Sequence, residues 1–229
     1  MKHRFFAAEP IEIGATVALS SEERHHARVL RVLEGEDVEL FDAQGNNYLG
    51  RFQSDGAVTV IERAANREPR AAIHLAMSII QLDKFELVLQ KGTELGVQSF
   101  IPLITDRMEV RIERVRGKEE RWRKIVLEAV KQSGRSRIPT IEAPARFEDA
   151  IARSGTKIVF DADTEPTATE QPSNPATLFI GPEGGFTERE LQVAAANGAI
   201  FQRLGPRRLR AETAALAAVT LISARSGDI

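Results

Sequence analysis

Residues 178–186 read LFIGPEGGF, in which a short apolar run enters a glycine-rich turn. The apolar run is typical of a buried strand, and the pattern of residues 188–196 after the turn is typical of a helix. In open α/β sheets, a turn between a parallel strand and a helix lies at the carboxyl edge of the sheet, where ligands bind. This stretch therefore predicts an α/β fold with a ligand site at the turn.

The composition of this turn indicates what kind of ligand it accepts. No Gly-Lys-Ser/Thr follows, so it is not a Walker A loop, and it does not match the Gly-x-Gly-x-x-Gly pattern of dinucleotide sites. Pro182 removes a backbone donor and Glu183 adds a negative charge, and both features oppose phosphate binding. A neutral or cationic ligand such as a sulfonium cofactor fits this turn, whereas a dinucleotide pyrophosphate fits it badly.

A second turn of the same kind lies at residues 204–216, which read LGPRRLRAETAAL. A strand again ends in Gly-Pro, and an alanine-rich helix follows, whose alanines also suit close packing. Two such turns at neighbouring strand ends predict facing loops around one ligand. Replacing Gly181 or Gly205 with valine should then abolish cofactor binding, because the side chain would enter the space of the ligand. Arg207, Arg208 and Arg210 would hold a polyanionic substrate beside it.

The net charge of −2 hides a marked polarity along the chain. Residues 107–137 contain eleven Lys or Arg against five Glu, and residues 203–210 contain four Arg and no acid. The remainder of the chain is therefore acidic. Two basic runs on an acidic protein indicate a localised polyanion site, although a solvated helix face is an equal alternative. At the end of the first run, Gln132, Ser133 and Arg135 combine groups suited to phosphate and base contacts.

The chain divides into two segments with different patterns of predicted secondary structure. Residues 1–70 contain short β-rich runs with Gly, Asn and Asp turns and one helix with Ser20 as N-cap, which predicts a small barrel. Residues 71–229 alternate apolar strands with helices, which predicts a parallel sheet covered on both faces. One long basic helix is expected over residues 113–133, and a polar loop over residues 163–175.

Other features exclude several classes of protein. There is no cysteine, so disulfides, cysteine-ligated zinc and thiolate nucleophiles are ruled out. The four histidines have no spacing that suggests a metal site. No apolar stretch is long enough for a bilayer, and the first ten residues lack the core of a signal peptide. We therefore expect a cytoplasmic protein without membrane or metal partners.

Several segments together resemble one known family. These segments are residues 90–97 (QKGTELGV), 132–135 (QSGR), 179–186 and 204–215, with residues 4–6, 25–31 and 40–42 resembling the barrel of the same family. They are similar to the RsmE family of SPOUT-class methyltransferases, which methylate N3 of one uridine in 16S ribosomal RNA. The resemblance covers nearly the whole chain, in order and in spacing.

The resemblance implies a fold and a set of site residues that composition and spacing do not show. It implies a PUA-like barrel at residues 1–70, a parallel sheet with a C-terminal trefoil knot at residues 71–229, and a homodimer. S-adenosylmethionine would be the cofactor and the small ribosomal subunit the partner. The expected cofactor-binding residues are Ile180, Gly181, Glu183, Gly184, Leu204, Gly205, Leu209, Thr213 and Ala214. The expected RNA-binding residues are Arg4, Lys91, Glu94, Gln132, Ser133, Arg135, Arg207 and Arg208.

The residues themselves are compatible with methylation at nitrogen or oxygen. Methylating C5 of a pyrimidine normally needs a thiolate, which this chain lacks, whereas attack by a nitrogen or oxygen lone pair needs positioning and the removal of a proton. Glu183 is a candidate base and Arg210 a candidate stabiliser of the uracil anion. Three alternatives stay open: a SPOUT ribose 2′-O-methyltransferase acting on ribosomal or transfer RNA, a non-catalytic ribosome-binding factor, and, with least support, a nicotinamide-dependent dehydrogenase.

Overall fold

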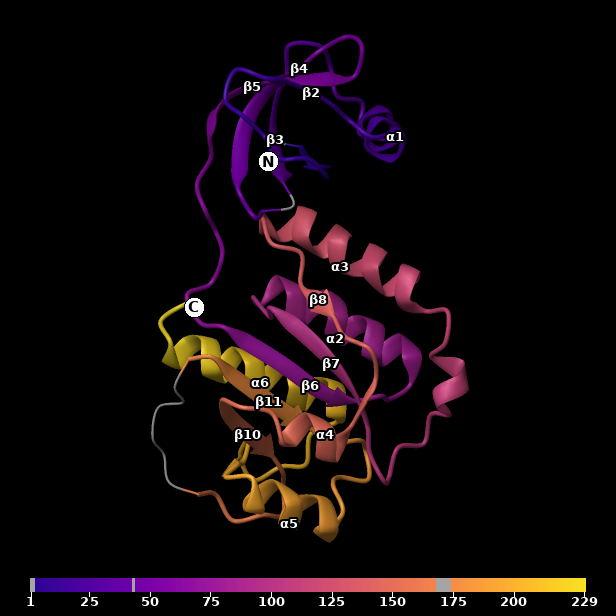
Figure 1. The fold of residues 1–229 in the computed structure, drawn as a ribbon, viewed down its shortest axis with the longest axis vertical. Coiled ribbons are helices and arrows are strands. Elements are labelled where there is room, and N and C mark those ends of the chain that lie inside the picture. The colour runs from indigo at the N-terminus through magenta and orange to yellow at the C-terminus, as the bar shows by residue number, and fades with distance from the viewer. Residues whose placement is uncertain (1–2, 43, 168–173) are drawn as a thin grey trace. The chain divides into compact units, whose positions relative to one another are not determined.

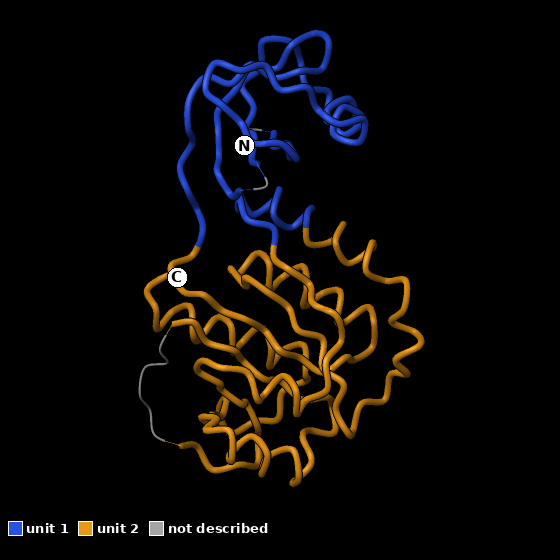
Figure 2. Tube along the Cα trace, viewed as in Figure 1, with its two compact units in different colours: residues 1–68, 127–138 blue, residues 69–126, 139–229 orange. Residues whose placement is uncertain are grey.

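The chain forms two compact units, and a short segment from the second half of the chain belongs to the first unit. The structure, a computed structural model, describes residues 3–42, 44–167 and 174–229. The first unit combines residues 1–68 with 127–138, and the second combines 69–126 with 139–229 (Figure 2). The first break in the chain lies close to the boundary expected at residue 70. The return of residues 127–138 to the first unit has no counterpart in the sequence-based division.

A five-stranded sheet and one helix build the first unit. The sheet has the order β1-β3-β4-β5-β2, in which β1 runs parallel to β3 and the other pairs are antiparallel. The turn between β3 and β4 contains Gly45 and Asn46, in line with the Gly and Asn turns expected in this segment, and Gly45 has a φ of 85°. The elements are β1 (Arg4–Ala7), β2 (Thr16–Ala18), α1 (Ser21–Val29), β3 (Asp37–Asp42), β4 (Asn47–Phe52) and β5 (Ala57–Arg63).

Buried ion pairs attach residues 127–138 to the rest of the first unit. The Lys131 ammonium lies 2.7 Å from a Glu23 carboxylate oxygen, and the Arg135 guanidinium lies 2.8 Å from Glu68; all four side chains are at most 8% exposed. Arg4 donates a hydrogen bond to the Val130 carbonyl at 3.1 Å. Charges buried this deeply are tolerated because they are paired. This segment therefore has a structural role in its unit.

Replacing Arg135 with methionine should lower the free energy of unfolding by about 3–5 kcal/mol at neutral pH, because the Glu68 carboxylate would stay buried without its cation. Burial alone would raise the pKa of Glu68, but hydrogen bonds from Arg135 and from the backbone N–H groups of Arg137 and Ser136 outweigh it and lower that pKa. A lowered folded-state pKa stabilises the fold above the unfolded-state value and ceases to do so as the pH falls through the folded-state value. The difference between variant and wild type should therefore shrink on acidification below pH 4.5. Denaturant unfolding at several pH values measures it, with the exposed neighbour Arg137→Met as the control.

A parallel sheet forms the centre of the second unit. The order along the sheet is β12-β10-β11-β6-β7-β8, with β9 also paired to β7, and all of these pairs are parallel. Its elements, drawn in Figure 1, are β6 (Ile73–Ser78), α2 (Leu82–Glu94), β7 (Ser99–Ile104), η1 (Ile112–Arg114), α3 (Glu119–Ser133), β8 (Thr140–Ile141), β9 (Ala145–Arg146), α4 (Phe147–Ile151), β10 (Thr156–Phe160), β11 (Ala176–Ile180), α5 (Glu188–Ala196), β12 (Ile200–Gln202) and α6 (Ala211–Arg225). The expected α/β fold with a parallel sheet is confirmed.

Helices cover both faces of this sheet, and successive strand residues point to opposite faces. Leu178 and Ile180 of β11 pack in a core with residues of α2, α6 and the start of α3. Phe179, between them, packs in a second core with Phe147 of α4 and Ala194 of α5. Burial on both faces explains why β11 reads as a continuous apolar run and not as an alternating one.

Two details differ from the sequence-based expectation. The basic helix begins at Glu119 and not at residue 113, because Gly117 has a φ of 78° and separates it from the short 3-10 helix η1. Strands β1 and β9 were not among the strands expected from the sequence. In the polar stretch 163–175, residues 168–173 lie outside the described residues. Across the described ranges, no helix has the length and apolar character needed to span a bilayer.

Candidate cofactor site

The glycine-rich turn at residues 181–186 connects β11 to α5. Gly185 has a φ of 69°, a region that favours glycine, and its N–H donates to the Pro182 carbonyl at 2.9 Å. Thr187 then caps α5, where its side chain and that of Glu190 form a reciprocal capping box. The turn is thus a defined structure between a buried strand and a capped helix, as the sequence predicts.

The second turn, at residues 203–210, connects β12 to α6. Gly205 has a φ of 89°, which explains glycine at this position. Arg203 anchors the start of the turn, since its guanidinium donates to the backbone carbonyls of Thr164 at 2.9 Å and Asp163 at 3.1 Å. Arg210 is the exposed N-cap residue of α6 and makes no side-chain capping bond.

A third loop, after β10, completes the site. The Asp161 carboxylate accepts hydrogen bonds from the backbone N–H groups of Asp163 and Thr164 and from the Thr164 hydroxyl, at 2.8 to 3.0 Å. This carboxylate therefore shapes the loop itself. Asp163 reaches across to Arg208 of the second turn, with 2.6 Å between the carboxylate and the guanidinium, and both side chains are about three-quarters exposed. The ion pair links the loops of two neighbouring strands.

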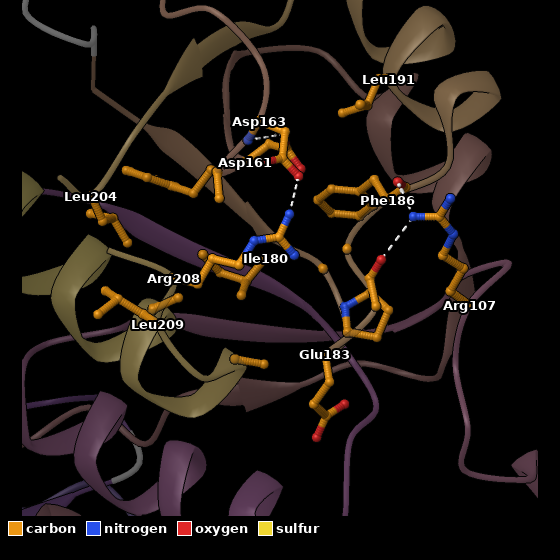
Figure 3. A pocket seen from close by; sticks show the side chains of 18 of the residues that line it. Arg107, Asp161, Asp163, Ile180, Glu183, Phe186, Leu191, Leu204, Arg208 and Leu209 are labelled. Atoms are coloured by element: carbon orange, nitrogen blue, oxygen red, sulfur yellow. Dashed lines mark hydrogen bonds and ion pairs between the residues drawn. The ribbon is translucent and has the colours of Figure 1, made fainter. Parts of the chain in front are cut away.

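These loops surround a cavity of about 250 Å³ at the carboxyl ends of β10, β11 and β12 (Figure 3). Its walls combine apolar side chains with three carboxylates and three guanidiniums. Glu183 points away from the Arg208–Asp163 pair in this view. The lining residues are Arg107, Phe160, Asp161, Ala162, Asp163, Ile180, Gly181, Pro182, Glu183, Gly184, Gly185, Phe186, Leu191, Leu204, Gly205, Arg207, Arg208, Leu209, Ala211 and Ala214.

Most residues expected to bind a cofactor line this one cavity. They are Ile180, Gly181, Glu183, Gly184, Leu204, Gly205, Leu209 and Ala214, joined by Arg207 and Arg208 from the expected RNA set. Thr213 and the candidate catalytic residue Arg210 are not among the lining residues. Sequence reasoning missed the loop after β10 and Arg107. An acid at the end of a buried strand was a usable signal for Asp161, whereas nothing local to Arg107 marks it.

The other residues expected to bind RNA lie elsewhere. Lys91 and Glu94 pair with each other on α2, with 2.8 Å between their charged atoms. Arg4 is 7% exposed and Arg135 is 3% exposed, and each has partners inside the first unit. Gln132 is exposed and Ser133 is half-buried, and its hydroxyl donates to the Ala129 carbonyl. The expected surface role therefore disagrees with the burial of Arg4 and Arg135.

No group of three or more His, Asp or Glu in the described part of the chain could hold a metal ion.

Comparison with known proteins places this geometry in a family. The model of the RNA methyltransferase domain matches residues 66–223, a range that includes every loop of the cavity. The ribosomal RNA small subunit methyltransferase E of Bacillus subtilis is 32% identical, and the match covers 94% of this chain and 92% of that protein. The chain belongs to this methyltransferase E family.

Two solved structures agree with the assignment over the full chain. The ribosomal RNA small subunit methyltransferase E of Neisseria gonorrhoeae, bound to S-adenosyl methionine, superposes with a TM-score of 0.90 at 31% identity and covers 98% of each chain. A methyltransferase of Legionella pneumophila, also in complex with S-adenosyl methionine, has a TM-score of 0.88 at 30% identity with the same coverage. The methyltransferase E family thus extends over both units of this chain.

Proposed function

We propose that this protein transfers the methyl group of S-adenosylmethionine to N3 of a uridine in the 16S ribosomal RNA of the small ribosomal subunit. The observation that carries the proposal is the cavity, because it joins eight of the nine residues expected to bind the cofactor in a member of the methyltransferase E family. Membership of the family supports the RNA substrate, and the choice of N3 rests on the resemblance to the RsmE family.

The cavity residues fit this cofactor. S-adenosylmethionine supplies an electrophilic methyl group on a positively charged sulfur, and the flat faces of its adenine ring suit apolar side chains. Asp161, Asp163 and Glu183 provide negative charge in the cavity wall, while Ile180, Leu209 and other apolar side chains suit the nucleoside. The absence of a phosphate-binding loop agrees with a cofactor that has no phosphate.

The chain's own residues would hold the RNA base and move its proton. The N3–H group of uracil must lose its proton before or during methyl transfer, and we propose the exposed carboxylate of Glu183 at the cavity as the acceptor. Arg210 lies in sequence between the lining residues Leu209 and Ala211, but its side chain is outside the lining. Its proposed role, to stabilise the uracil anion, therefore requires that the guanidinium turn toward the bound base.

Two exposed arginines at the cavity support the proposed RNA contact. Arg207 and Arg208 belong to the turn before α6, and both line the cavity while remaining exposed. Guanidinium groups bind phosphate oxygens through paired hydrogen bonds. We propose that they hold the backbone next to the target uridine, with Lys91, Glu94, Gln132 and Ser133 as further proposed contacts.

The proposed architecture includes a PUA-like barrel, a trefoil knot and a homodimer, as the resemblance implies. The sheet of the first unit supports the barrel. In the second unit, β12 pairs at the sheet edge with β10, whereas α6 packs against β11, β6 and α2, so that the chain crosses past β10 between them. That crossing supports the knot.

The homodimer interface is proposed to include α6, where the apolar residues Leu216 and Ala217 are only half-buried within the chain. Because the proposed substrate is ribosomal RNA, we also propose a cytoplasmic location.

Ligand titration tests the cofactor assignment directly. We expect S-adenosylhomocysteine, the product form of the cofactor, to bind in isothermal titration calorimetry with a stoichiometry of one per chain, and NAD to show no heat of binding. The reason is that the turn at residues 181–186 lacks the donors that a pyrophosphate needs. Binding of NAD in place of S-adenosylhomocysteine would contradict the proposal and favour a dehydrogenase.

A further inference from the structure

An arginine from a distant loop holds the glycine-rich turn. Arg107 lies three residues after β7, and its Nη1 atom donates to the carbonyl of Gly184 at 2.8 Å and to that of Phe186 at 3.2 Å (Figure 3). Its stem packs on the turn as well, since a Cβ built at Gly184 would lie 3.5 Å from the Cβ and Cδ atoms of Arg107. One side chain thus contacts the turn through both its charge and its carbon atoms.

A second set of hydrogen bonds ties the same two loops together. The buried Glu190 carboxylate accepts from the backbone N–H of Asp106 at 3.0 Å through one oxygen and from that of Thr187 at 2.7 Å through the other. The Thr187 hydroxyl lies 3.1 Å from the Asp106 carboxylate. At the base of the loop, the buried hydroxyls of Ser78 and Thr105 are 2.8 Å apart. The backbone that presents Arg107 is therefore fixed.

The two glycines leave part of the turn free to change conformation. Pro182 has a fixed φ but no N–H to donate, whereas residues 184 and 185 are both glycine, the residue with the greatest backbone freedom. The bond from the Gly185 N–H to the Pro182 carbonyl closes the turn internally. Its remaining shape depends on outside contacts, of which the two bonds from Arg107 are charge-assisted and therefore among the stronger kind.

We propose that Arg107 is a positioning residue that keeps the turn at residues 181–186 in the conformation that binds the cofactor. This inference rests on the proposed function, because it takes the cavity to be the cofactor site. Without the two bonds the turn would sample other conformations. The apparent affinity for the cofactor would then fall in proportion to the fraction of molecules that keep the binding conformation. Arg107 acts through the turn, so methyl transfer at saturating cofactor should be spared.

Three variants of the full chain test the proposal. Arg107→Met keeps most of the carbon stem and removes the donors, and we expect the Kd for S-adenosylhomocysteine and the KM for S-adenosylmethionine to rise about tenfold. Arg107→Lys restores one charged donor and should recover about half of that loss on a logarithmic scale. Arg153→Met is the matched control, an arginine of similar surface character that pairs with Glu142 and does not line the cavity, and it should bind like wild type.

The split between kinetic constants separates positioning from other roles. We expect kcat at saturating cofactor and the KM for RNA to stay within about twofold of wild type for Arg107→Met. Unchanged cofactor affinity in this variant would overturn the proposal, and so would a raised KM for RNA alone, which would make Arg107 an RNA contact. If wild type itself failed to bind S-adenosylhomocysteine, the proposed function would fall first, so the two failures are distinguishable.

Discussion

Replacing Gly181 with valine is expected to weaken the binding of S-adenosylhomocysteine by about a hundredfold. A Cβ at this position would lie 3.3 Å from the carbonyl carbon of Gly185 and 3.3 Å from the ring of Phe186, closer than ordinary packing allows. Valine adds two further methyl groups, and overpacking of this kind costs up to about 3 kcal/mol, which is roughly a hundredfold in affinity if the turn yields. Calorimetric titration measures the loss.

The structure adds a second reason for this prediction. From the sequence, a new side chain at Gly181 or Gly205 is expected to occupy the ligand's space, and at Gly181 it would also meet the turn itself. At Gly205, the space beside an added Cβ is open within 4 Å, and the φ of 89° would in addition make valine strained.

Gly184→Ala is the matched control within the same turn, because its Cβ would be at an ordinary 3.5 Å from the side chain of Arg107. It should cost only a few-fold in affinity. A well-folded Gly181→Val variant with wild-type affinity would show that this turn does not shape the site.

Reversing both charges at Arg207 and Arg208 should weaken RNA binding by about a hundredfold at low salt, because two phosphate contacts become repulsive. Counterions released from phosphates drive such binding, so log K should fall linearly with log salt, and the slope should be shallower in the variant by roughly 0.7–0.9 per lost contact. The affinity for S-adenosylhomocysteine should change far less. Filter binding or fluorescence anisotropy with a 16S ribosomal RNA fragment over a salt series gives both the RNA affinity and its salt dependence.

The double variant Arg146→Glu/Arg153→Glu is the matched control, since it changes the net charge equally at two exposed arginines that do not line the cavity. Its RNA affinity should fall much less than that of the cavity variant. Equal losses in the two double variants would mean that RNA responds to net charge and not to this turn.

The sequence predicted the site best where the signal is local. A buried strand, a glycine-rich turn and a helix are adjacent in the chain at residues 178–196, so their arrangement follows from neighbouring residues. The second turn, at residues 203–210, is local in the same way. The convergence of the two turns on one cavity follows from the general rule that strand ends of a parallel sheet meet at one edge.

The features that the sequence did not predict depend on contacts between distant residues. Arg135 reads as an exposed cation at the end of a basic run, but its partner Glu68 precedes it by 67 residues and buries it. Arg107 likewise contacts carbonyls 77 and 79 residues away. The predicted start of the basic helix was wrong for a different reason. The run of charged residues continues across Gly117, but the helical conformation does not, because Gly117 has a positive φ.

The central claim is methyl transfer to N3 of a uridine in 16S ribosomal RNA, and one measurement tests it most directly. Small ribosomal subunits from a strain that lacks this activity are incubated with the protein and S-adenosylmethionine labelled in its methyl group, and the RNA is then digested to nucleosides and separated by mass and retention. We expect the label in 3-methyluridine at a stoichiometry approaching one per 16S ribosomal RNA, and far less label with the Gly181→Val variant at the same cofactor concentration. Label in a 2′-O-methylated nucleoside, or no transfer to RNA by a protein that binds S-adenosylhomocysteine, would contradict the account.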